Sequence, residues 1–145
     1  MSITSAVANS FKTEVLEGIH DLTTDVIKLA LIKSTPSGTY GKATTNLSDV
    51  TGNTDEATGT GYTAGGNTLA NASVTLDGDT AIVDFDDTVF TSSTISADGA
   101  IIYNSSKTNR AIAIIDFGGT VTSTAGDFSI EFPVAAAATS IITLT

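Results

Sequence analysis

The apolar positions near the start of the chain follow the spacing of a short helix. Four of them fall at i, i+4, i+5 and i+8, which places them on one stripe of an α-helix. Asn9 and Ser10 offer side-chain oxygens that can cap the first turn, and Gly18 weakens the helix near its end. The pattern therefore predicts a helix over residues 10–19. The residues on its apolar stripe are Phe11, Val15, Leu16 and Ile19.

Beyond residue 25 the pattern is that of β-strands. The first run places Ile27, Leu29 and Leu31 on one face of a strand. Asp77-Gly78-Asp79 lies between two β-rich runs and predicts a tight hairpin, because glycine tolerates the positive φ of such a turn. The pattern contains nine β-rich runs, two of which (89–91 and 95–96) are only two or three residues long, and it predicts about seven or eight strands. A turn is expected at 104–109 and a break at Gly118-Gly119. The runs are residues 26–32, 68–76, 80–85, 89–91, 95–96, 99–103, 111–117, 128–132 and 140–144.

One long segment interrupts this pattern. Residues 33–67 are polar and rich in glycine, and loops longer than about 15 residues usually have a function of their own. We therefore expect an extended arm or a long loop at residues 34–67, with the first ten residues as a second candidate for an arm. A chain of 145 residues has room for one core, so we expect residues 1–145 to form a single domain.

The composition favours the same β-rich fold. The chain contains 26 Thr and 15 Ser but few of the long side chains that fill helices, and β-branched Thr favours strands. It contains no Cys, which excludes disulfides, thiolate nucleophiles and zinc–thiolate sites. We predict a mostly β fold, a single-domain β-sandwich or jelly roll with one short N-terminal helix.

The charge of the chain restricts its partners. Six Lys and Arg stand against sixteen Asp and Glu, for a net charge of −10, and no basic residue lies between Lys42 and Lys107. Because phosphate backbones and anionic headgroups repel such a surface, we expect neither nucleic acid nor membrane as a partner. The start of the chain lacks the pattern of a signal peptide, so we expect the protein to be made in a cytoplasm.

Candidate catalytic residues are few. His20 beside Asp21 could belong to a nucleophilic constellation, but a histidine at a helix end, held by local hydrogen bonds, is the simpler interpretation. The glycine-rich run 59–66 lacks the lysine of a phosphate-binding loop. Lys28 is expected to face outward or to protect a sheet edge, and Asp116 has no obvious second acid to form a catalytic pair. We therefore expect no catalytic residue and no cofactor.

The remaining candidate is a cation site near the predicted hairpin. Calcium takes about six to eight oxygen ligands, which acidic hairpin loops can supply. The spacing of these acids does not match an EF-hand loop, so a solvated acidic surface is the preferred interpretation and a cation site the alternative. The residues concerned are Asp77, Asp79, Asp84, Asp86 and Asp87.

Eight segments of the chain share a pattern with known proteins. They are NSFK (9–12), VLEGIHDL (15–22), DVIKLALI (25–32), GTGYTAGG (59–66), DDTVF (86–90), STISA (93–97), AIIYN (100–104) and IDFGG (115–119). In this order they resemble small structural proteins encoded by tailed bacteriophages and prophages, over nearly the whole chain. The chain departs from that group at the Ala-rich stretch from Ala135 to Ala138 and at Phe90, where Trp is expected.

The resemblance implies a virion component without catalytic residues. The expected role is a capsid cement or decoration protein on the outside of the shell, which bridges major capsid proteins and assembles as a homotrimer. A tail, neck or fibre accessory protein is the alternative. A second alternative, a calcium-assisted carbohydrate-binding module, is opposed by the lack of Trp and the presence of only three Tyr, because sugars stack on aromatic rings.

Overall fold

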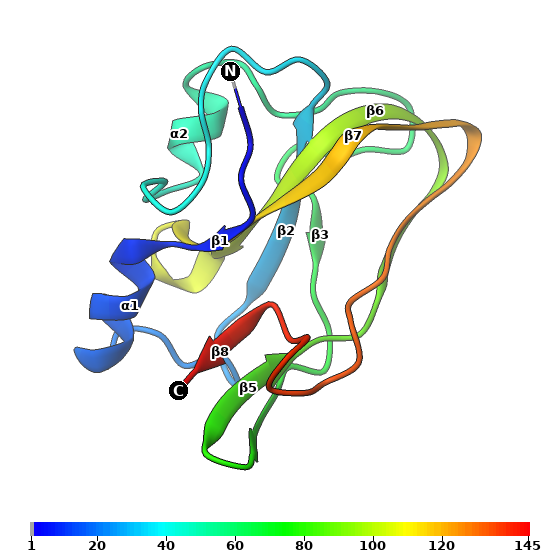
Figure 1. Cartoon of the computed structure of the whole chain (residues 1–145). Helices are drawn as coiled ribbons and strands as arrows, with labels where there is room; N and C mark the ends of the chain where they lie inside the picture. The colour runs from blue at the N-terminus through cyan, green and yellow to red at the C-terminus, as the bar shows by residue number, and fades with distance from the viewer. Residues whose placement is uncertain (1) are drawn as a thin grey trace.

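The protein is described over residues 2–145 by a computed structural model, and this part of the chain is mostly β (Figure 1). Its elements, in chain order, are β1 (Ala6–Val7), α1 (Asn9–Leu16), β2 (Ile27–Lys33), α2 (Ser48–Thr51), β3 (Asn67–Thr68), β4 (Ser73–Asp77), β5 (Thr80–Asp84), β6 (Thr88–Asn104), the 3-10 helix η1 (Ser105–Lys107), β7 (Arg110–Ile130) and β8 (Ile142–Leu144). The predicted fold class is confirmed.

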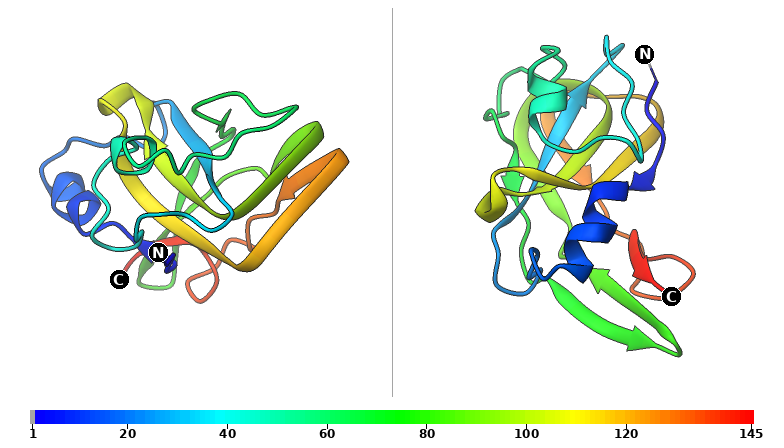
Figure 2. Two further views of the ribbon diagram at one scale, coloured as in Figure 1. Left: turned by 90° about the horizontal axis from the view of Figure 1, so that it is seen from above. Right: turned by 90° about the vertical axis from the view of Figure 1, so that its left-hand side faces the viewer.

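The strands form two antiparallel sheets, an arrangement consistent with a β-sandwich. The larger has the order β1-β7-β6-β2-β3 and the smaller the order β4-β5-β8. The long β6–β7 hairpin dominates the larger sheet, and its two strands bend together along their length (Figure 2). One hydrophobic core joins both sheets, because it includes Leu29, Ile101 and Ile114 from the larger and Ile142 from the smaller.

The helix α1 begins differently from the prediction. Its N-cap is Ala8, which makes no side-chain capping bond, so the predicted cap by Asn9 or Ser10 is wrong. The backbone N–H groups of Ala8 and Asn9 donate instead to carbonyls of Ile112 and Lys42, because the chain enters the helix directly from β1. Gly18, at a φ of +75°, follows the helix as expected. Leu16 does not share the buried stripe and is 83% exposed.

Two long strands, β6 and β7, stand where the sequence pattern predicts several short strands. β6 and β7 each continue through positions predicted as breaks, including Gly118-Gly119. These glycines lie in a bulge, since pairing with β6 stops at Asp116 and resumes at Val121. The hydroxyl of Thr120 donates to Asp98 Oδ1 at 2.6 Å across this irregularity. A bulge bends a strand and leaves the ladder intact on both sides, which is why the glycines do not end it.

The segment from residue 34 to 67 is a long loop that packs against the body, and the expectation of an extended arm is wrong. Tyr40 and Val50 are only 2% and 0% exposed. Isolated bridges join Ile32 to Glu56 and Thr60 to Thr94. The first residues do not form an arm either, because Ile3 bridges to Tyr40 and β1 pairs with β7.

The predicted hairpin at residues 77–79 is confirmed. β4 and β5 pair antiparallel without interruption and are joined by a two-residue turn, in which Gly78 has a φ of +62°. The hairpin extends away from the larger sheet (Figure 2). All five residues of β4 are exposed, and β8 covers only the opposite edge of β5.

Candidate functional site

The five aspartates near the hairpin do not come together as a cation site. Asp77 Oδ2 accepts a hydrogen bond from the Ala137 N–H, and Asp87 Oδ1 accepts one from the Phe132 N–H, both at 2.7 Å. Over residues 2–145, no three acidic or histidine side chains are placed to hold a metal ion. The structure therefore uses these two carboxylates to attach the C-terminal segment to the hairpin and its base.

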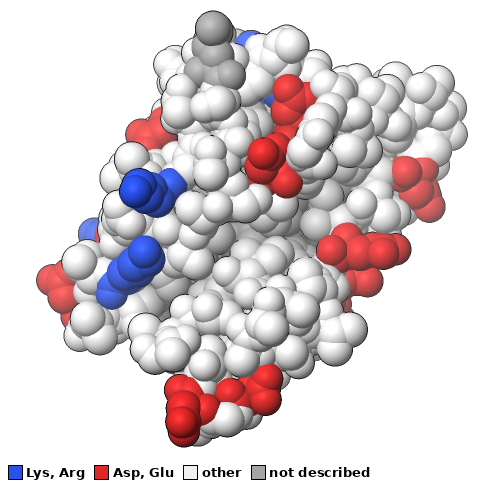
Figure 3. All heavy atoms as spheres, in the orientation of Figure 1, with Lys and Arg blue, Asp and Glu red and all other residues white. Residues whose placement is uncertain are grey.

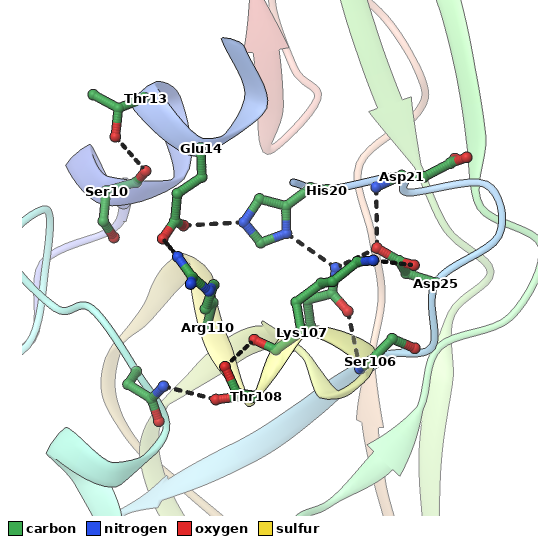
Figure 4. A network of polar contacts seen from close by, with 12 residues as sticks. Ser10, Thr13, Glu14, His20, Asp21, Asp25, Ser106, Lys107, Thr108 and Arg110 are labelled. Atoms are coloured by element: carbon green, nitrogen blue, oxygen red, sulfur yellow. Dashed lines mark hydrogen bonds and ion pairs between the residues drawn. The ribbon is translucent and has the colours of Figure 1, made fainter. Parts of the chain in front are cut away.

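His20 lies in a buried polar network rather than beside Asp21 (Figure 4). Its Nε2 is 3.0 Å from Glu14 Oε1 and its Nδ1 is 3.0 Å from Asn104 Nδ2. The ring packs against Phe11 with centroids 4.9 Å apart. The prediction of a local hydrogen bond is confirmed by Glu14, whereas Asp21 instead accepts bonds from Thr23.

The network continues on both sides of His20 (Figure 4). The second Glu14 oxygen accepts a hydrogen bond from Arg110, and Asn104 donates to Asp25 at 2.7 Å. Burial raises the pKa of Glu14, but the hydrogen bonds from His20 and Arg110 outweigh it and lower that pKa overall. The network ties α1 and the turn after it to the connection between β6 and β7. Its arrangement serves packing, because its polar atoms satisfy one another.

A second polar centre, Asp55, organises the long loop. Its carboxylate is fully buried and accepts hydrogen bonds from the backbone N–H groups of Ser37 and Gly38 at 2.9 and 2.8 Å and from the Tyr40 hydroxyl at 2.5 Å. Lys33 Nζ lies 3.1 Å away. Burial by itself raises the pKa of Asp55, but these four partners hold it well below its usual range. Burial and the hydrogen bond to Asp55 raise the pKa of Tyr40 to about 12.

The next residue, Glu56, holds the glycine-rich run in place. Its Oε1 accepts hydrogen bonds from the Tyr62 hydroxyl at 2.7 Å and from the Gly65 N–H at 2.5 Å. The Tyr103 hydroxyl donates to the Gly65 carbonyl at 2.6 Å. Burial and Glu56 raise the pKa of Tyr62 above its usual range, and burial raises the pKa of Tyr103 to about 12. Residues 59–66 are therefore a loop held in place by hydrogen bonds to Glu56 and Tyr103.

Sequence reasoning missed both of these centres. Their only signal is a pair of adjacent acids, Asp55 and Glu56, inside a polar glycine-rich segment. Nothing in that local pattern distinguishes them from exposed acids such as Asp79. Lys28 does not protect a sheet edge, because β2 lies between β6 and β3, and it is half-buried. Asp116 is exposed and its carboxylate accepts the N–H of Gly118.

The hollows of the surface are shallow and open. One of about 300 Å³ lies where the long loop meets β6 and β7, and another of about 260 Å³ lies beside the glycine-rich run. Neither contains His20 or Asp116. The first is lined by Lys33, Ser34, Thr58, Thr94, Ile95, Ser96, Thr122 and Ser123, a set of mainly hydroxyl groups without a carboxylate.

The smaller sheet offers a different kind of surface. Val74 and Leu76 on β4 are 48% and 73% exposed, and Leu144 on β8 is 59% exposed. The two outer strands of this sheet, β4 and β8, each leave one edge without a partner strand among residues 2–145. Open strand edges with apolar side chains are typical of surfaces that pair with another chain.

Charge is distributed unevenly around this sheet. In the view of Figure 3, acidic side chains lie at the bottom, where Figure 1 places the β5 hairpin, and also at several other places on this face, whereas the most prominent basic side chains lie on the left, near α1. Residues 73–87 contain five Asp and no Lys or Arg. None of the helices in the described part of the chain is long and apolar enough to cross a membrane.

Comparisons with known proteins give no relatives. No family model matches the chain, and neither the curated proteins nor the solved structures include a match. The surfaces and polar networks described above are therefore the basis for a functional proposal, together with the resemblance of the sequence segments.

Proposed function

We propose that the protein is a structural component of a tailed-bacteriophage virion, and specifically a capsid cement or decoration protein that binds the outside of the shell. The proposal takes its class from the eight segments that resemble small phage structural proteins. The observation that carries it is the smaller sheet, which presents two open edges and the exposed apolar side chains of Val74, Leu76 and Leu144. Such a surface suits a protein that acts by attachment.

The polar networks agree with a structural role. Glu14, His20 and Asn104 join α1 to the β6–β7 connection. Asp55 joins the long loop to Lys33 at the end of β2, through an ion pair with its side chain and a hydrogen bond from its backbone N–H. These side chains contribute to a rigid body. A rigid body binds with less loss of conformational entropy than a flexible one, which favours attachment to a preformed lattice.

The proposed mechanism is adhesive. Each copy makes a modest contact with the major capsid protein. Because the contact is repeated over the lattice, the many contacts together stabilise the shell against the pressure of the DNA inside it. The net charge of −10 keeps an abundant protein soluble before assembly. By analogy with the resembled group, the attached form is expected to be a trimer, which the mass of the purified protein tests.

Cosedimentation with shells tests the proposal. Purified protein is mixed with shells of the phage that lack it, and the bound amount is quantified against the major capsid protein. Saturable binding at hundreds of copies per shell is expected. Absence of binding to shells would refute the capsid role, and a dozen or fewer copies in mature virions would favour the tail, neck or fibre alternative.

A further inference from the structure

The outer edge of β4 has unpaired backbone groups. Asp77 and Thr80 flank the two-residue turn and form a hydrogen-bonded pair, so pairing with β5 alternates from there along the strand. The N–H and C=O groups of Val74 and Leu76 therefore point away from β5. Within residues 2–145, no strand or loop backbone bonds to them.

The side chains of the same two residues are apolar and exposed. The register places Val74 beside Val83 and Leu76 beside Ala81. On the far side of β5, Ala81 is opposite Leu144, which extends the apolar strip across the sheet. This apolar strip is uncovered on β4, the outer strand, where Leu76 is 73% exposed. An added strand could cover it and satisfy the open backbone groups together.

The edge lacks the features that usually prevent such pairing. Natural edge strands are protected by lysine, proline, bulges or short length. β4 has five residues, contains neither Lys nor Pro, and pairs with β5 without a register shift. Its only charged residue is Asp77, at the end of the strand. The edge is therefore suited to accept a partner strand.

The charges around the edge select the partner. Asp77 lies on the polar face of β4, and Asp84 lies on the same face because it pairs with Ser73. Asp77 Oδ2 accepts a hydrogen bond from the Ala137 N–H, but none of the ion pairs within residues 2–145 involves Asp77 or Asp84, so both keep a negative charge without a cationic partner there. A second copy of the chain would bring the same acids to the interface, whereas a strand with Lys or Arg on this face would pair with them.

We propose that the β4 edge binds an extended, basic segment of a different protein, which adds a strand to the smaller sheet. The apolar side chains of this segment cover Val74 and Leu76. Its Lys or Arg side chains, at alternate positions, lie beside Asp77 and extend over the short side chain of Ser73 toward Asp84 on β5. The segment belongs to the shell protein, and in this respect the inference rests on the proposed function. The mode of binding is β-augmentation, in which main-chain bonds give affinity and alternate side chains give specificity.

Two substitutions at one position test the edge. Leu76→Lys places an unfavourable charge on the apolar strip and next to an incoming basic strand. Leu76→Pro removes the outward N–H without removing a bond to β5, a placement that edge strands tolerate. Leu16→Lys is the matched control, because Leu16 is 83% exposed on α1. Circular dichroism and thermal unfolding verify that all three variants are folded.

The assay is cosedimentation with shells that lack the protein. We expect both Leu76 variants to bind at least tenfold more weakly than the wild type and Leu16→Lys to bind equally well. Wild-type binding should weaken as salt rises from about 0.05 to 0.5 M, because opposite charges are screened. This combination supports the inference.

Three other outcomes overturn it and remain distinguishable. Wild-type binding that persists in both Leu76 variants rejects the edge but leaves the proposed function intact. Failure of the wild type to bind shells rejects both. Self-association of the free protein that Leu76→Lys abolishes, measured by sedimentation equilibrium, would make a second copy the occupant instead.

Discussion

Replacement of Asp55 tests whether a single buried carboxylate organises the long loop. Asp55→Asn conserves the shape of the side chain but removes its charge and one of its two acceptor oxygens. In the native protein those oxygens accept from the N–H groups of Ser37 and Gly38 and from the Tyr40 hydroxyl. The amide of Asn must therefore direct its own N–H groups toward at least one donor. The loop should loosen around residues 37–40.

The expected loss of stability follows from these contacts. Hydrogen bonds to charged groups contribute about 1.5–3 kcal/mol each, and breaking a buried ion pair costs about 3–5 kcal/mol. Lys33, the ionic partner, has a side chain that is 35% exposed, so solvent reduces its share. We expect Asp55→Asn to lower the free energy of unfolding by about 3 kcal/mol at pH 7, a large part of the roughly 5–15 kcal/mol typical of a domain.

Urea denaturation at pH 7 and at pH 3 measures this effect and its pH dependence. The pKa of folded Asp55 is lower than that of the unfolded chain. Its stabilising effect is therefore complete above the unfolded pKa of about 3.9 and is lost as pH falls toward the folded pKa. At pH 3 the unfolded aspartate is mostly protonated, which should reduce the difference between wild type and Asp55→Asn by about 1 kcal/mol.

Two results would refute this reasoning. One is a difference below about 1 kcal/mol at pH 7, which would mean that the donors find other partners at little cost. The other is a difference that does not decrease at pH 3, which would mean that the charge of Asp55 is not what stabilises the loop. Asp79→Asn is the control, because Asp79 lies exposed in the hairpin turn; it should change stability by less than about 0.5 kcal/mol.

Two further predictions concern a glycine and the tyrosines. Gly66 and Gly118 share a φ of +76°, but an added Cβ would lie 1.8 Å from the Leu29 carbonyl oxygen at Gly66 and would meet nothing at Gly118. Gly66→Ala should therefore cost at least 3 kcal/mol more than Gly118→Ala in urea unfolding, on the order of a severe core substitution, and equal effects would contradict the close approach. The pKa values of Tyr40, Tyr62 and Tyr103 are all raised by burial first. Absorbance at 295 nm should show little tyrosinate at pH 10.5 in the folded protein and ionisation near pH 10 in urea, and stability should fall as pH rises from about 10 toward 12. Full ionisation of the folded protein at pH 10.5 would contradict the burial of these hydroxyls.

The local pattern of residues determined the β-rich class and several elements. Alternating apolar positions located β2, and Gly78 between acidic neighbours located the β4–β5 turn. These features depend on backbone preferences and side-chain periodicity, which neighbouring residues express on their own. The same pattern also determined the acidity of the hairpin, on which the proposal of a basic partner strand rests.

Only the tertiary structure decided which polar residues are buried and stabilise the fold. His20 bonds to Asn104, 84 positions away in the sequence, and Asp55 is buried because the long loop folds back on the sheet instead of extending as an arm. The local pattern at Gly118-Gly119 predicts the end of a strand, but the pairing of β6 with β7 continues beyond these glycines. Burial and pairing of these residues depend on contacts between distant segments, whose free energy no local pattern expresses. The sequence by itself therefore determined a β-rich, acidic chain, and the packing of its distant segments decided which side chains stabilise it and which strand edge remains open.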